Sequence, residues 1–213
     1  MTGGKLIFEP DLSVVVIGGT SNVGKSTLAQ ALARRLGWSC VSTDSLGRHP
    51  GRPWTVADRQ IPAHVAEHYL SLSIEELATA QLRHYARMWP VIRSLIATHA
   101  ADHDDGGLIL EGSGAWPDRV AEISDPKVAA IWLTASPATV RGRIYSASRY
   151  AELADDAAIL VDKFVGRSNL YNEVMLSAVR RLGLACVDVD DVCSPGALLE
   201  RSLRLFDGPG RLG

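Results

Sequence analysis

One short stretch near the N-terminus carries the residues whose types and spacing point most directly to chemistry. Residues 19–26 read GTSNVGKS and match the pattern G-x-x-x-x-G-K-[ST] in full. Glycine permits a positive φ and lets backbone amides approach an anion, and a helix N-terminus adds partial positive charge. In such a loop the lysine reaches the β- and γ-phosphates of a nucleotide, and the serine hydroxyl ligates Mg²⁺. The residues expected to hold the phosphates are Gly19, Ser21, Asn22, Val23, Gly24, Lys25, Ser26 and Thr27.

Two acids follow predicted strands further along the chain. Asp44 comes after CVST at 40–43, and Glu111 ends the apolar run LILE at 108–111. Ligands of a parallel sheet bind beyond the carboxyl ends of its strands, so both acids should lie near the Gly-rich loop. Asp44 can accept the proton of an acceptor hydroxyl or hold Mg²⁺ through water, and Glu111 can orient a Mg²⁺-bound water or contact the acceptor. The structural alternatives are an Asx-turn or helix cap for Asp44 and a cap of the next turn for Glu111.

Five arginines are candidates for binding anionic groups. Arg48 and Arg52 lie in an irregular Gly/Pro-containing loop, and Arg141, Arg143 and Arg149 lie in or beside a predicted helix. Guanidinium groups bind carboxylate or phosphate in a bidentate manner, which suits Arg48 and Arg52 to an anionic or polar acceptor. If the bound nucleotide transfers a phosphoryl group, negative charge spreads over its equatorial oxygens, and at least one of the other three should then stabilise that charge. The alternative for each is an exposed arginine that pairs with local acids.

The elements on either side of the Gly-rich loop are those that a phosphate-binding loop requires. Residues 13–17 read SVVVI, a β-branched apolar run typical of a buried strand. After the loop, Leu28, Leu32 and Leu36 recur at helical spacing, and Gly37 is placed to end the helix. The order of strand, loop and helix argues against a chance Gly-rich turn with an exposed lysine.

The whole chain alternates between short apolar runs and helical patterns. This alternation predicts an α/β fold, with a parallel sheet covered by helices on both faces and right-handed crossovers. A capping box at residues 73–76 opens a long helix in which Pro90 should cause a kink or a break. With no repeat and no linker, residues 1–213 are predicted to form one domain. The predicted strands are 13–17, 40–43, 108–111, 128–134 and 185–190, and the predicted helices are 25–36, 73–99, 156–182 and those that begin at 137 and 195.

Composition narrows the class of protein and of partner. The chain is 46% hydrophobic and 22% charged, with a net charge of −2, and no basic stripe suggests nucleic acid. No apolar run is long enough to span a membrane, and the N-terminus lacks the apolar core of a signal peptide. Cys40 and Cys186 lie in apolar runs and are predicted to be buried, reduced thiols, which fits a cytoplasmic protein. The expected partner is a small molecule, and no oligomeric state is predicted.

Four segments carry a resemblance to a known group of enzymes. The chain resembles the P-loop small-molecule kinases, the group of shikimate, gluconate, nucleoside-monophosphate and adenylylsulfate kinases, and most of all the 2-phosphoglycerate kinase-like proteins. The resemblance implies a P-loop NTPase three-layer sandwich with strand order 2-3-1-4-5, an acceptor-binding helical region at about 45–103 and an arginine-bearing lid at about 141–158. The segments are GGTSNVGKST at 18–27, VSTDSLGRHP at 41–50, LILEGSGAWP at 108–117, and residues 162–191.

The resemblance also implies an activity and further site residues. Such a protein would transfer a phosphoryl group from ATP, with Mg²⁺ held by Ser26 and Asp44, to a hydroxyl of a small metabolite. Arg167 becomes a substrate-binding candidate, because such kinases often have a basic residue in the helix after the lid, and residues 190–195 would lie near the adenine. Two alternatives remain open: a kinase of nucleoside monophosphates or of an antibiotic, and a nucleotide-dependent switch or regulatory ATPase.

Overall fold

The computed structural model describes residues 12–47, 51–54, 61–101, 106–206 and 210–212 of the chain. A mostly parallel sheet with strand order β2-β3-β1-β4-β5 forms the middle layer, and a short strand, β6, pairs antiparallel with β4. The strands are β1 (Val14–Gly19), β2 (Ser39–Ser42), β3 (Leu108–Glu111), β4 (Asp125–Thr134), β5 (Cys186–Asp188) and β6 (Arg211–Leu212). The α-helices are α1 (Lys25–Leu36), α2 (Ala63–Ser71), α3 (Ile74–Ala101), α4 (Pro117–Val120), α5 (Pro137–Ser148), α6 (Asp155–Arg181) and α7 (Pro195–Phe206), with 3₁₀ turns at Thr43–Ser45, Tyr150–Glu152 and Val189–Asp191.

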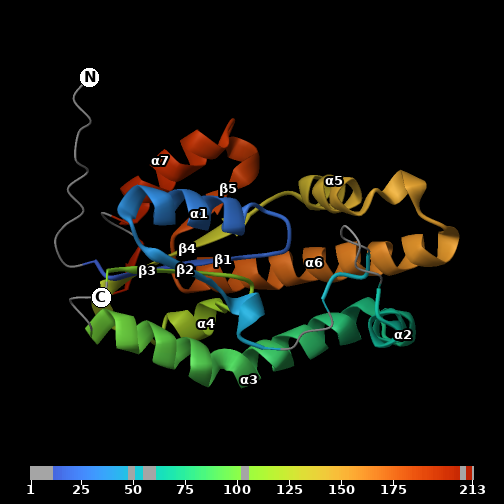
Figure 1. Ribbon diagram of the computed structural model, residues 1–213, viewed down its shortest axis with the longest axis horizontal. Coiled ribbons are helices and arrows are strands. Elements are labelled where there is room, and N and C mark those ends of the chain that lie inside the picture. Colours follow the sequence, from blue (N-terminus) through green and yellow to red (C-terminus); the bar gives the residue numbers. More distant parts are fainter. Residues whose placement is uncertain (1–11, 48–50, 55–60, 102–105, 207–209, 213) are drawn as a thin grey trace.

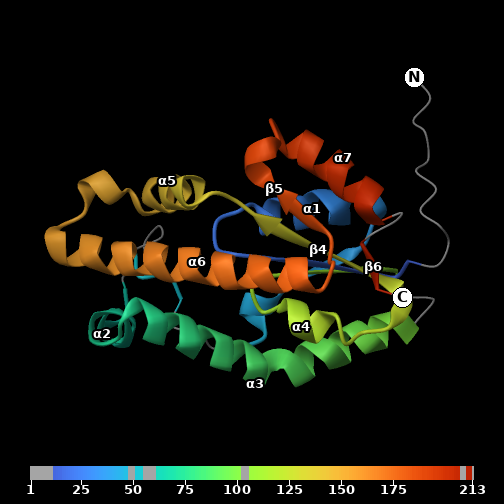
Figure 2. The same ribbon diagram turned by 180° about the vertical axis from the view of Figure 1, so that it is seen from behind.

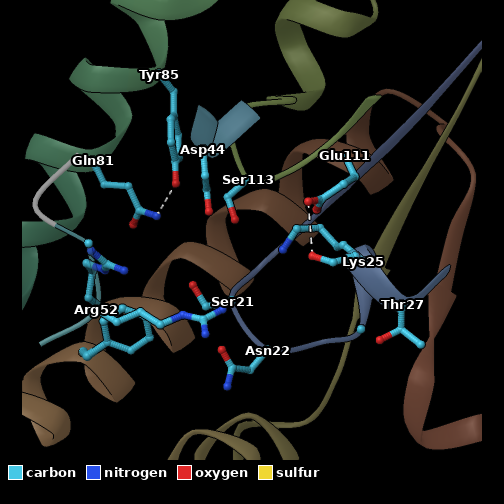
Figure 3. A pocket seen from close by; sticks show the side chains of 15 residues that line it. Ser21, Asn22, Lys25, Thr27, Asp44, Arg52, Gln81, Tyr85, Glu111 and Ser113 are labelled. Carbon is cyan, nitrogen blue, oxygen red and sulfur yellow. Dashed lines mark hydrogen bonds between the residues drawn. The ribbon is translucent and has the colours of Figure 1, made fainter. Parts of the chain in front are cut away.

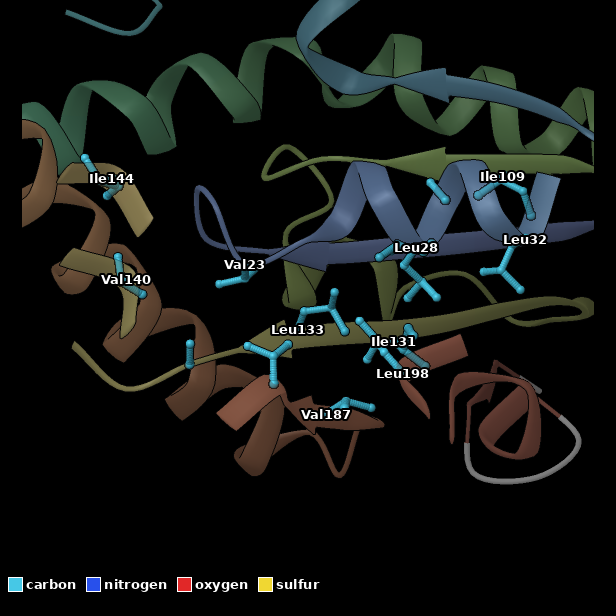
Figure 4. Packing of buried hydrophobic residues seen from close by; sticks show 14 of the residues in the cluster. Val23, Leu28, Leu32, Ile109, Ile131, Leu133, Val140, Ile144, Val187 and Leu198 are labelled. Atoms are coloured by element: carbon cyan, nitrogen blue, oxygen red, sulfur yellow. The ribbon is translucent and has the colours of Figure 1, made fainter. Parts of the chain in front are cut away.

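Helices cover both faces of this sheet, as Figures 1 and 2 show. On one face α1 packs against β1 and β3 and α7 packs against β4, and Leu28 and Leu32 of α1 belong to the same buried apolar cluster as Ile131 and Leu133 (Figure 4). On the other face α3, α4 and α6 cover a second apolar cluster, which contains Trp132. Full burial of a leucine or isoleucine side chain contributes roughly 1.5–3 kcal/mol, so these two layers hold the sheet edge rigid.

The register of the central strands places the functional residues at one edge. Ile17 at the end of β1 lies opposite Glu111 at the end of β3, and Ser42 at the end of β2 lies opposite the same glutamate. The chain leaves β1 into residues 20–24 and leaves β2 into the turn at Thr43–Ser45, which contains Asp44. The Gly-rich loop, Asp44 and Glu111 therefore meet at the carboxyl ends of three adjacent strands.

Local sequence signals predicted several element ends correctly. The helix after the loop spans Lys25–Leu36 and ends at Gly37, whose φ of 72° is the left-handed conformation that glycine adopts easily. The capping box is present as two hydrogen bonds, from Ser73 N to Glu76 Oε2 (2.8 Å) and from Glu76 N to Ser73 Oγ (3.2 Å). Ser136 caps α5 by accepting a hydrogen bond from Thr139 N.

The structure differs from the expectations at several places. Pro90, where a kink or a break is expected, does not break the helix: α3 runs from Ile74 to Ala101 and buries Trp89 and Ile92 on either side of the exposed proline. That burial offsets the roughly 3 kcal/mol that a proline costs inside a helix. Cys40 is exposed rather than buried because β2 is an edge strand, and Cys186 is half-buried. The sixth strand, β6, was not predicted.

Two further predictions concern membrane spans and Arg48. Among the described residues, no helix combines the length and the apolar character needed to cross a bilayer. Arg48, which we predict to bind the acceptor, lies outside the described residues, as do residues 55–60.

Candidate active site

The Gly-rich loop has the backbone geometry of an anion cradle. Asn22 and Gly24 have φ of 61° and 103°, so the chain turns through left-handed conformations before α1 begins at Lys25. At Gly19, with φ of 140°, a Cβ atom would lie only 2.5 Å from the carbonyl oxygen of Leu133, so only glycine fits there. The loop thus presents its amides beside the N-terminus of a twelve-residue helix, where an anion is stabilised.

Lys25 lies at the centre of the site and is 8% exposed. Its Nζ donates a hydrogen bond to the carbonyl oxygen of Thr20 at 2.6 Å, which closes the loop on itself. Burial lowers the pKa of Lys25, and the negative charges of Glu111 and Asp44 partly offset that effect. The ammonium group is therefore a poorly hydrated cation whose charge two nearby acids favour, and an incoming phosphate would be a stronger partner than the carbonyl.

Ser26 and Glu111 form a polar pair beside the lysine. Ser26 Oγ donates to Glu111 Oε1 at 3.1 Å, and the glutamate is 6% exposed at the end of β3. Among the described residues there is no cluster of three or more His, Cys, Asp or Glu residues with metal-binding geometry. Mg²⁺ needs no such cluster, because it is bound through one or two protein oxygens, phosphates and waters. The exposed Ser26 hydroxyl and the Asp44 carboxylate, which line the same cavity, fit that donor set.

Asp44 faces this cavity from the turn after β2 (Figure 3). Its backbone N–H donates to Ser42 Oγ at 3.4 Å, so serine rather than aspartate caps the turn. Within the described part of the chain, no hydrogen bond or ion pair within 4 Å fixes the Asp44 carboxylate, which is exposed. The structural alternative of a capping role is thus filled by Ser42, and the carboxylate is available for a ligand.

The loop, Asp44 and Glu111 line one cavity of about 340 Å³ together with residues from distant segments. In Figure 3, Gln81, Tyr85 and Asp44 lie on the side opposite Ser21 and Asn22. Burial raises the pKa of Tyr85 to about 12, so its hydroxyl stays protonated at neutral pH. Of the lining residues that sequence reasoning did not single out, Ser113 follows β3 in a Gly-Ser-Gly turn. The others, Gln81, Tyr85 and Phe164, lie on long helices and carry no local signal.

Among the described residues, the arginines that line this cavity are Arg52 and Arg167. Arg52 is exposed and lies over the ring of Trp54, with its guanidinium carbon 5.8 Å from the ring centroid. Arg167 is 2% exposed and lies 4.4 Å from the ring centroid of Phe164, and its Nη1 donates to the Tyr69 hydroxyl at 2.7 Å. The structure thus brings both arginines to the cavity that the loop and Asp44 also line, and their role toward an acceptor stays a prediction.

The three arginines expected on the lid lie in different surroundings. Arg143 reaches the loop, where its Nη1 donates to the carbonyl oxygen of Asn22 at 3.3 Å. Arg149 ends α5 in a left-handed conformation, with φ of 52°, and pairs with Glu152 at 3.9 Å on the surface. Arg141 is exposed and lines none of the described cavities. Of the three, Arg143 is therefore the one placed at the phosphate cradle in this conformation.

A second cavity of about 270 Å³ lies on the other side of the loop. Val23, Gly24 and Thr27 form one wall, and Arg143 borders it. The segment after β5 forms the opposite wall, which is the position expected for the residues near a nucleotide base. The residues from that segment and from α7 are Val189, Val192, Cys193, Ser194, Pro195 and Leu198.

Comparisons with known proteins agree with this architecture. No family model matches the chain, and no curated protein matches its sequence. The gluconokinase from Sinorhizobium meliloti 1021 is 16% identical over 92% of each chain, with a TM-score of 0.49. The shikimate kinase from Acinetobacter baumannii, solved in complex with shikimate, is 14% identical over 91% of this chain and 92% of that chain, with a TM-score of 0.47. The deoxyadenosine kinase from M. mycoides, solved with bound dATP, is 13% identical over 92% of this chain and 100% of that chain, with a TM-score of 0.52.

At these identities the likeness concerns the fold alone, and it rests on the deoxyadenosine kinase, whose TM-score exceeds 0.5. The strand order β2-β3-β1-β4-β5 and the position of the Gly-rich loop after β1 are the order and the position that the sequence resemblance implied. The chain therefore has the α/β fold of the P-loop small-molecule kinases.

Proposed function

We propose that this protein is an ATP- and Mg²⁺-dependent phosphotransferase that phosphorylates a hydroxyl group of a small metabolite. One observation carries the proposal. A phosphate-binding loop and an unengaged carboxylate, Asp44, line the same cavity, and the far wall of that cavity is built from polar side chains of α3 and α6. A protein that only binds nucleotide needs the loop, whereas a kinase also needs a base and a place for the acceptor.

Each residue of the loop and the cavity has a separate role in the proposed reaction. Lys25 and the loop amides hold the β- and γ-phosphates, and Ser26 and Asp44 are the residues that would hold Mg²⁺. When bound, the metal ion neutralises charge on the phosphate oxygens. The acceptor oxygen forms a bond to the γ-phosphorus as the bond to the β–γ bridging oxygen breaks, and the hydroxyl proton passes to Asp44. ADP leaves with that bridging oxygen, and Arg143 stabilises the negative charge that develops.

The second cavity suits the base of the nucleotide. It adjoins the loop through Val23 and Gly24, and its apolar wall of Val189, Val192 and Leu198 offers a surface for a flat ring. Exposed Cys193 lies in that wall and provides a chemical probe of occupancy.

Bound nucleotide is expected to protect Cys193 from alkylation. If the base covers the thiol, the rate of alkylation by iodoacetamide falls by the factor 1 + [ATP]/Kd, about 100-fold at an ATP concentration of about 100 times Kd. Mass spectrometry of the labelled peptides measures each cysteine separately. Cys40 is the internal control, because it is exposed on β2 and lines none of the described cavities. Equal rates at Cys193 with and without nucleotide would place the base elsewhere.

Acceptor-dependent ADP release tests the function itself. Purified protein with ATP and Mg²⁺ is expected to release ADP slowly alone and much faster with one pool of hydroxylated metabolites, drawn from hydroxy acids, sugars, nucleosides, nucleotides and antibiotics. A phosphorylated product detected in that pool establishes the transfer. Nucleotide binding with slow hydrolysis that no pool accelerates would instead favour a nucleotide-dependent switch.

A further inference from the structure

Two buried polar side chains of the cavity each have one atom without a hydrogen-bond partner among the described residues. Arg167 is 2% exposed and Gln81 is 4% exposed, and both line the cavity. The Nε of Arg167 and the Oε1 of Gln81 are buried without a hydrogen bond. Buried polar groups are nearly always paired, because an unpaired one loses its bonds to water without replacement. An unpaired polar atom in a residue that lines a cavity indicates that a bound ligand supplies the missing hydrogen bond.

The described residues that hold Arg167 in place are neutral. Its Nη1 donates to the Tyr69 hydroxyl, and Tyr69 in turn donates to the carbonyl oxygen of Gly51 at 3.1 Å. The guanidinium lies against the rings of Phe164 and Tyr69, with centroid distances of 4.4 and 5.6 Å. Among the described residues no carboxylate pairs with it, since the salt bridges there involve other arginines. An arginine stays charged at any ordinary pH, so this cation is buried and oriented, and none of the described residues supplies its counter-charge.

Among the described residues, one side-chain hydrogen bond orients the amide of Gln81. Its Nε2 donates to the Tyr85 hydroxyl at 2.7 Å, so the other end of the amide is left for a ligand (Figure 3). A hydroxyl group of the ligand can both donate and accept, and it therefore suits an amide in either orientation. Asp44 faces the same space and would meet the hydroxyl that reacts.

We infer that the acceptor is a compact hydroxy acid whose carboxylate binds Arg167 and one of whose hydroxyl groups binds Gln81. This inference rests on the proposed phosphotransferase function and names its substrate class. A planar carboxylate matches the edge of a guanidinium in a bidentate way, and one buried cation balances its single charge. The cavity of about 340 Å³ must also take the terminal phosphates of the nucleotide, which leaves room for a small acceptor.

Matched pairs of acceptors test the inference. Short-chain hydroxy acids are compared with their primary amides, which keep the shape and the hydroxyl groups but lose the charge. In the wild type, kcat/KM for one acid is expected to exceed that for its amide at least tenfold. In Arg167→Met, kcat/KM for the acid is expected to fall roughly 10- to 100-fold, because KM rises. The value of kcat/KM for the amide should change little, so the ratio of the two values approaches one.

Variants separate this role from a structural one. Arg180→Met, on the same helix α6 but exposed, is the matched control and should keep the wild-type ratio. Arg167→Met should melt at or above the wild-type temperature, because it replaces a buried unpaired charge by an apolar side chain. Gln81→Leu should raise KM for both members of a pair.

The outcomes distinguish the inference from the function on which it rests. If an amide or a neutral polyol stimulates ADP release as well as the acid does, the phosphotransferase function stands and the carboxylate inference is wrong. The same holds if only phosphate esters stimulate release and their dephosphorylated forms do not. If no acceptor of any class stimulates release although ATP binds, the proposed function fails first, and the inference fails with it.

Discussion

Replacing Lys25 by methionine is expected to lower kcat at least about 10²- to 10³-fold, the loss that follows removal of one preorganised charge from a transition state. The side chain is 8% exposed and lines the same cavity as Glu111 and Asp44, beside the phosphate cradle. Methionine fills nearly the same volume but cannot donate to the transferred phosphoryl group. Steady-state ADP release with a stimulating acceptor measures the effect.

Stability should not account for this loss. In the folded protein, burial is the largest influence on Lys25, and it lowers the pKa of the ammonium below its ordinary value of 10.5. A lowered pKa on a base means that folding disfavours the charged form at every pH at which the unfolded chain is protonated. Removing the charge therefore relieves a cost at neutral pH, and the melting temperature of Lys25→Met should stay within a few degrees of the wild type.

Lys127→Met is the matched control for Lys25→Met. Lys127 Nζ also donates to a backbone carbonyl, that of Ala100 at 3.1 Å, but it lines none of the described cavities. Turnover by Lys127→Met should equal that of the wild type. A folded Lys25→Met protein that turns over at the wild-type rate would contradict the mechanism, whatever the acceptor is.

The parts of the fold that could be predicted from sequence are those with strong local signals. The helix bounds Lys25–Leu36 follow from the loop before it and the glycine after it, and Glu111 follows from a buried apolar strand. Once these strands are known to be parallel, their carboxyl ends must share an edge, so Asp44 and Glu111 are placed beside the loop by topology. The sequence signal of the Gly-rich loop is strong because its backbone geometry and its proposed phosphate binding require the same glycines and the same lysine.

The remaining parts depend on contacts between distant segments. Gln81 lies in the middle of the predicted helix, and its sequence position gives no sign of a binding role. Its side chain faces the cavity because α3 packs against α6. Pro90 reads as a helix breaker, yet the tertiary burial of its neighbours outweighs the lost hydrogen bond. Cys40 is predicted to be buried because it lies in a short strand-like run, and nothing local reveals that β2 is an edge strand.

Replacing Asp44 by asparagine is expected to lower kcat about 10²- to 10⁴-fold, the contribution typical of a general base. Asparagine keeps the size of the side chain and its place after β2 but cannot take the acceptor's proton. Asp44 is exposed and capped by Ser42 rather than acting as a cap, so the fold should tolerate the change. The affinity for ATP, measured by titration without acceptor, should change little.

The Mg²⁺ dependence of Asp44→Asn decides between the two roles open to this carboxylate. A lost base lowers kcat at every Mg²⁺ concentration, because proton transfer is impaired however full the metal site is. A lost metal contact through water instead raises the Mg²⁺ concentration needed for half-maximal rate, and saturating metal restores much of kcat. Asp118→Asn is the control, since Asp118 is ion-paired with Arg181 on the surface, where such a pair is worth about 0–1 kcal/mol. Wild-type kcat in Asp44→Asn at all Mg²⁺ concentrations would exclude both roles and move the search for the base to Glu111, the other carboxylate of the cavity.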